Sequence, residues 1–176
     1  MFPLSFTEII LLAGLAGLGL YVLREDLRNM EIPALPVFSL TGLALAFGIF
    51  FPLAGGPVPP GLATAATGAL IGLGLSVFVR LYTTWRVGAP AFGGADILLI
   101  IGGGGMLGPV YFGPWLLAAC IIALLLAFIG PALARRRETE IEGETLRVIP
   151  FCPALLASWA LTWALARSGQ LAFLAG

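Results

Sequence analysis

The chain has few ionisable side chains, and two of them are candidates for acid–base chemistry. Of its nine acidic residues, seven are glutamate and only two are aspartate, Asp26 and Asp96. Asp96 lies in the stretch FGGADILLII, residues 92–101, directly ahead of an apolar run. A carboxylate next to hydrocarbon is costly, so an ionisable residue in such a segment is a functional candidate.

The composition excludes several other kinds of catalytic site. There is no histidine, so Ser-His-Asp, Cys-His and the usual zinc hydrolase sites cannot be assembled. The two cysteines, Cys120 and Cys152, are far apart and match no metal-ligand or disulfide spacing. We therefore expect no cofactor and no metal, and the zero net charge gives no indication of a nucleic-acid partner.

Two neighbouring carboxyl groups could hydrolyse a peptide bond without a metal or a covalent intermediate. The reaction needs a base that activates water and an acid that protonates the leaving amine. A pair that shares one proton supplies both, because like charges in contact cannot both ionise. Gly93 and Gly94, just before Asp96, would let an extended substrate backbone approach closely.

Each aspartate also has other interpretations. Asp96 lies where an N-cap or first-turn carboxylate stabilises a helix, and Asp26 lies in an arginine-bearing segment where a solvated charge is common. Both could also form an ion or proton relay in a membrane transporter. The spacing alone leaves these alternatives open.

The elements that must position the aspartates are long apolar runs. The chain is 60% hydrophobic and 10% charged, with a mean hydropathy of +1.05. About 20 apolar residues cross the hydrocarbon of a bilayer. The composition and the runs predict an all-α, polytopic membrane protein, with one domain over residues 1–176 and six transmembrane helices. These helices are expected at residues 4–23, 34–53, 62–82, 96–112, 114–134 and 151–167.

Two smaller features belong to this prediction. Four glycines at residues 102–105 are expected either to permit close helix packing or to break the fourth helix. Trp85, Tyr111 and Trp115 are expected at the membrane interfaces, where aromatic residues gather.

The arginines predict the orientation of the helices. Eight of the nine arginines fall at the ends of the first, third and fifth predicted helices, and only Arg167 lies at the other face. The positive-inside rule places the arginine-bearing ends in the cytoplasm and the N-terminus outside. Asp26 and Asp96 then share the cytoplasmic face, although they are seventy residues apart.

Three segments of that face resemble the prepilin and preflagellin peptidases. DLRNMEIP, residues 26–33, is similar to the segment after the first catalytic aspartate of that family. GGAD, residues 93–96, is similar to its Gly-x-Gly-Asp motif, and IPFCP, residues 149–153, to a segment that opens a late helix. The order of the segments and the six-helix layout also agree, so the resemblance covers nearly the whole chain.

The resemblance implies an aspartic endopeptidase of the cell membrane, with Asp26 and Asp96 as its catalytic pair. Such enzymes remove the leader of type IV pilin-like or archaeal flagellin precursors at the cytoplasmic face. Ala95 and Ala34 depart from the common motifs, and the cysteine-rich loop of many bacterial members is missing. We therefore expect a peptidase without methyltransferase activity, of the archaeal type or a short form.

The substrates of that family carry basic residues just before the cleaved bond. Glu31, within the first segment, is a candidate for binding them, together with Gly93 and Gly94 beside the second aspartate. The acidic residues of the segment 138–144 are interpreted as a solvated loop.

Overall fold

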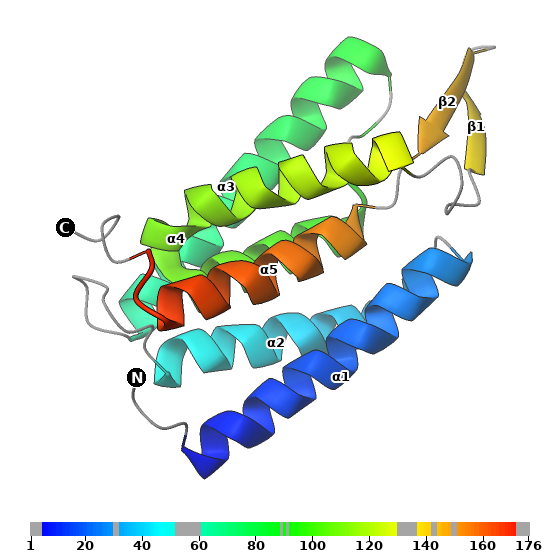
Figure 1. Ribbon diagram of the computed structural model, residues 1–176. Coiled ribbons are helices and arrows are strands. Elements are labelled where there is room, and N and C mark those ends of the chain that lie inside the picture. The colour runs from blue at the N-terminus through cyan, green and yellow to red at the C-terminus, as the bar shows by residue number, and fades with distance from the viewer. Residues whose placement is uncertain are drawn as a thin grey trace.

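The computed structural model describes a helical bundle that carries a small hairpin. The described residues are 5–29, 32–51, 61–88, 90, 92–129, 137–141, 144–148 and 151–171. They form the helices and strands α1 Phe6–Asn29, α2 Ala34–Phe50, α3 Leu62–Val87, α4 Gly94–Ile129, β1 Arg137–Ile141, β2 Glu144–Val148 and α5 Cys152–Arg167 (Figure 1). The two strands pair antiparallel, with Arg137 opposite Val148. The all-α prediction is confirmed for the bundle, and the hairpin lies where residues 138–144 were expected as a solvated loop.

The helices give the chain the character of a membrane protein. Three spans, Phe6–Arg28, Leu62–Val87 and Gly94–Phe128, are long and apolar enough to cross a bilayer, and α2 is a shorter apolar helix. Large apolar side chains such as Phe78 and Phe128 are mostly exposed on the outside of the bundle. Such a surface suits contact with lipid.

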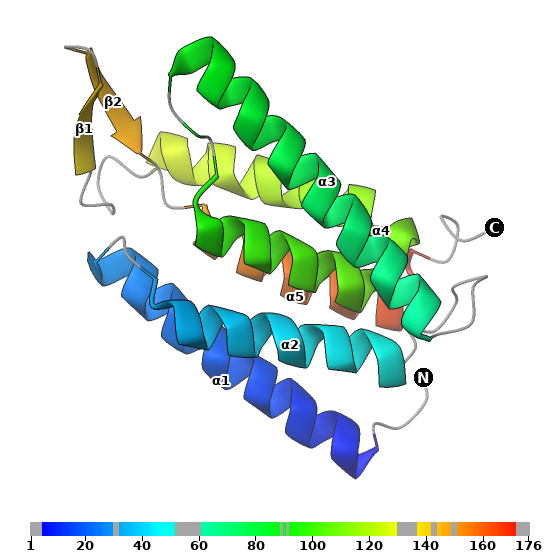
Figure 2. The same cartoon turned by 180° about the vertical axis from the view of Figure 1, so that it is seen from behind.

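Helix α4 contains a reversal of the chain at Gly108. This residue has φ 73° and ψ 174°, which are not helical, and Pro109 follows it. A Cβ atom on Gly103 would lie 2.5 Å from the ring of Trp115. In a straight helix, residues twelve apart are separated by about 18 Å. The arms 94–107 and 109–129 therefore fold back on each other, as Figures 1 and 2 show.

The reversal corrects two expectations from the sequence. The fourth helix was expected to continue to residue 112, but its first arm ends at residue 107, two residues after the last of the four glycines. Because the chain turns back there, Tyr111 and Trp115 point into the bundle and are 2% and 0% exposed. Only Trp85, which is 77% exposed, has the surface position expected of an interface aromatic.

The four glycines at residues 102–105 lie inside the first arm, at the point where α2 and α3 approach it most closely. A Cβ on Gly68 of α3 would lie 2.0 Å from the carbonyl oxygen of Gly104. A Cβ on Gly48 of α2 would lie 2.2 Å from the carbonyl oxygen of Gly105. Close approach of helix backbones through small residues is typical of membrane proteins. Close packing is thus confirmed, and a helix break within these four glycines is not found.

The helix ends gather at two ends of the bundle. Figures 1 and 2 place the end of α1, the starts of α2, α4 and α5, and the hairpin together at one end. The end of α3, the helix that carries Arg80 and Arg86, lies on the same side (Figure 2). We call this the arginine end, and both aspartates belong to it.

The opposite end is held by an ion pair between α1 and α5. At the start of α1, the backbone N–H of Glu8 donates to Ser5 Oγ at 3.2 Å, and the Ser5 N–H donates back to Glu8. This reciprocal cap holds the Glu8 side chain at the helix start. Arg167, in the last turn of α5, donates both terminal nitrogens to the Glu8 carboxylate, and both side chains are largely buried.

Candidate active site

Asp26 lies in the last turn of α1 rather than in a loop. The helix was expected to end near residue 23, but it continues to Asn29. On this helical extension the Asp26 side chain turns inward and is only 7% exposed. Its Oδ2 atom is fully buried and has no hydrogen-bond partner among the described residues. A solvated surface charge, one of the interpretations of the sequence, does not describe this carboxyl group.

Asp96 lies in the first turn of α4 and is half-buried. Its Oδ2 accepts a hydrogen bond from the backbone N–H of Gly93 at 3.1 Å. The expected helix-capping role of Asp96 is therefore correct, and it fixes the direction of the side chain. Gly93 and Gly94 are exposed, and a Cβ on Gly94 would meet nothing within 4 Å. The backbone ahead of Asp96 is open to an approaching chain.

The two aspartates come together at the arginine end. They belong to the end of α1 and the start of α4, and they are close enough for a Coulombic interaction. The thiol of Cys152, the first residue of α5, interacts electrostatically with both of them and is 1% exposed. The end of α1 and the starts of α4 and α5 thus bring three ionisable side chains within electrostatic range of one another.

The segment ahead of Asp96 is fixed by contacts from α3 and α5. Arg80 Nη1 donates a hydrogen bond to the carbonyl oxygen of Phe92 at 3.1 Å. The ring of Phe92 stacks on that of Phe151, with 5.5 Å between centroids. Because Phe92 adjoins Gly93, these contacts also hold the backbone N–H that orients Asp96. They join the start of α4 to the start of α5.

One hydrogen bond anchors α4 farther along. Thr41 Oγ1 of α2 donates to the carbonyl oxygen of Leu98 at 3.0 Å. Asp96 is therefore held on both sides, by Gly93 before it and through Leu98 after it. A site built on helices that are fixed in this way keeps its geometry better than one on a free loop.

The structure brings together most of the residues expected in the site. Asp26, Asp96, Gly93 and Gly94 lie at the same end of the bundle, whereas Glu31 lies outside the described residues. Cys152, Arg80 and Phe92 were not expected as part of the site. The segment IPFCP carried a signal for Cys152, since it placed that residue at a helix start on the same face as both aspartates.

Two carboxyl groups within Coulombic range of each other are the groups that activating a water molecule and moving a proton would require. Within the described residues, no three Cys, Asp or Glu side chains are grouped in a way that could hold a metal ion. The unpartnered Oδ2 of Asp26 needs a donor, and a proton shared with a second carboxyl or a bound water would provide one.

Comparison of this chain with protein-family models, with curated proteins and with solved structures gives no match.

Proposed function

We propose that the chain is a membrane-embedded aspartic endopeptidase in which Asp26 and Asp96 activate a water molecule. The observation that carries the proposal is the meeting of the only two aspartates of the chain at one end of the bundle, with one carboxyl oxygen buried and unpartnered. In the reaction, water attacks the scissile carbonyl while one carboxyl accepts its proton. The other carboxyl protonates the leaving amine. No cofactor takes part in this scheme.

The membrane layout that we propose has six crossings, with the N-terminus outside and the arginine end in the cytoplasm. The reversal at Gly108 supports it, because the two arms of α4 then count as separate crossings of opposite direction. The arginines of α1 and α3 at the end that carries the aspartates support the orientation. The protein is then a multi-pass protein of the cell membrane whose active site faces the cytoplasm.

The substrates that we propose are pilin-like or flagellin-like precursors, from which the enzyme removes the leader. The resemblance of residues 26–33, 93–96 and 149–153 to prepilin and preflagellin peptidases supports this substrate class. The open backbone at Gly93 and Gly94 supports it as well, because an extended peptide could lie against it. An ion or proton relay would need its carboxyls near the middle of the membrane, whereas both lie at helix ends.

The test is cleavage of a leader-bearing pilin-like precursor by membranes that contain this chain. We expect a shortened product whose new N-terminus lies just ahead of the apolar helix of the precursor. Membranes without the chain provide the control. If an abundant, folded protein leaves the precursor intact, the proposed function is wrong.

Arg80 provides a further prediction, because it positions the segment that orients Asp96. Arg80→Gln is expected to lower kcat/KM for precursor cleavage about tenfold, which corresponds to about 1.4 kcal/mol of transition-state stabilisation. The shorter amide cannot reach the Phe92 carbonyl in the same way. Arg86→Gln, at the same end of α3, is the control, since the guanidinium of Arg86 lies over the Trp85 ring instead. Equal losses in both variants would contradict a specific role for Arg80.

A further inference from the structure

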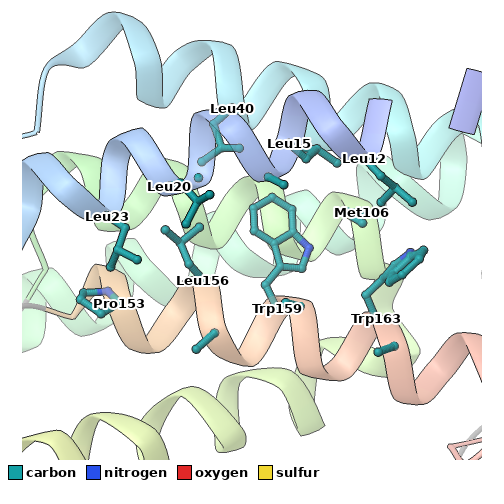
Figure 3. Close-up of a pocket in the computed structure, with 15 residues that line it drawn as sticks. Leu12, Leu15, Leu20, Leu23, Leu40, Met106, Pro153, Leu156, Trp159 and Trp163 are labelled. Atoms are coloured by element: carbon teal, nitrogen blue, oxygen red, sulfur yellow. The ribbon is translucent and has the colours of Figure 1, made fainter. Parts of the chain in front are cut away.

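An apolar groove of about 550 Å³ lies between α1 and α5 (Figure 3). One wall extends from Leu12 to Leu23 on α1, and the other from Pro153 to Ala164 on α5. Leu40 of α2 and Met106 of α4 lie at its base. Between Leu12 and Leu23 the helix rises about 16 Å, so the groove is about three helical turns long.

Small side chains create the groove. The wall on α1 includes Ala16 and Gly19, and the wall on α5 includes Ala157, Ala160 and Ala164, which share one face of that helix. The three alanines are exposed. The ion pair of Glu8 with Arg167 holds α1 and α5 together beyond the end of this stretch. The two helices are thus joined at one end, and small side chains keep the space between them open.

The groove leads to the aspartates. Leu23 lies one turn before Asp26 on α1, and Pro153 directly follows Cys152 on α5. Figure 3 shows Leu23 and Pro153 at one end of the groove and Leu12 and Trp163 at the other. A rod-like ligand in this groove would therefore leave it next to the catalytic pair.

We infer that the groove binds the first turns of the apolar helix of the precursor, and this inference rests on the proposed function. Exposed small residues along one helix face allow another helix to pack closely in a membrane, and a lipid chain has no need of them. Docking the substrate helix along α1 and α5 brings the peptide just ahead of it to Asp26 and Asp96. The open backbone at Gly93 and Gly94 can then receive that peptide.

The first test compares two substrates. One is the leader-bearing precursor, and the other is a short peptide that contains the cleaved bond but ends before the apolar helix. In Ala160→Trp the indole fills the groove, so we expect KM for the precursor to rise at least tenfold more than KM for the peptide. Ala66→Trp, on an exposed position of α3, is the control and should not change the ratio of the two KM values.

Different failures have different meanings in this test. If the unaltered enzyme cleaves both substrates and Ala160→Trp affects them equally, the groove does not bind the substrate helix, while the proposed function stands. If the unaltered enzyme cleaves neither, the proposed function is wrong and this inference fails with it.

The second test detects binding without cleavage. A photo-crosslinking amino acid replaces Leu20, which lines the groove, or Leu70 on α3, and each of these leucines is 66% exposed. In an Asp96→Asn background, which retains the precursor, we expect crosslinks to the apolar helix of the precursor from position 20 and not from position 70. Crosslinks from position 20 only to lipid, or only to a second copy of the chain, would overturn the inference.

Discussion

Asp26→Asn and Asp96→Asn are each expected to reduce kcat/KM for precursor cleavage at least about a thousandfold. General acid–base catalysis contributes about 10²–10⁴ to the rate of an enzyme reaction, and here both roles depend on one shared proton. An amide cannot exchange that proton, so either substitution disables the whole pair. The double variant is expected to be no worse than either single variant, because residues that act as a unit are not additive.

The measurement is the initial rate of cleavage at equal amounts of membrane-inserted protein. Glu25→Gln is the matched control, since it neutralises the carboxylate next to Asp26 on the same helix and should keep most of the activity. Asp96→Asn retains an oxygen that can accept the Gly93 N–H bond, so the start of α4 should stay in place. Full activity in either aspartate variant would refute the proposed mechanism.

The helices could be predicted from the sequence because apolar runs and breakers are local signals. The starts of α2 and α3 at residues 34 and 62 agree with the prediction, and α5 starts one residue later than expected. The turn between the fourth and fifth runs was predicted a few residues too late. The four glycines at residues 102–105 were one candidate for a break in the fourth helix, but they pack against the backbones of α2 and α3. The turn is made instead by Gly108. Whether a glycine permits close packing or makes a turn depends on the neighbouring helices, which the local sequence does not reveal.

The site could be predicted in part. The order of the helices and the position of the arginines were enough to place Asp26 and Asp96 at the same end. Their burial was not predictable, because α1 continues beyond the apolar run and turns Asp26 inward. The contacts of Arg80 with Phe92, and of Phe92 with Phe151, join segments that are far apart along the chain. Such contacts depend on how the helices pack, and the local sequence pattern does not specify that packing.

The close approach of α3 to α4 gives the largest expected effect on stability. At Gly68 an added Cβ would lie 2.0 Å from the Gly104 carbonyl oxygen and 2.8 Å from its carbonyl carbon. Backbone atoms cannot rotate away as a flexible side chain can, so the two helices must separate. Their separation would also disturb the first arm of α4, which carries Asp96 in its first turn.

Gly68→Ala is therefore expected to destabilise the protein by about 3 kcal/mol, at the upper end of the usual cost of overpacking. In detergent, this should lower the apparent midpoint of thermal unfolding by roughly 6–12 °C. Gly74→Ala makes the same chemical change on the same helix, at a position where a Cβ meets nothing within 4 Å. There, the lower backbone entropy of alanine in the unfolded chain should leave stability unchanged or raise it slightly. Equal midpoints for the two variants would show that the α3–α4 contact does not require glycine, and the packing described for the four glycines would be wrong.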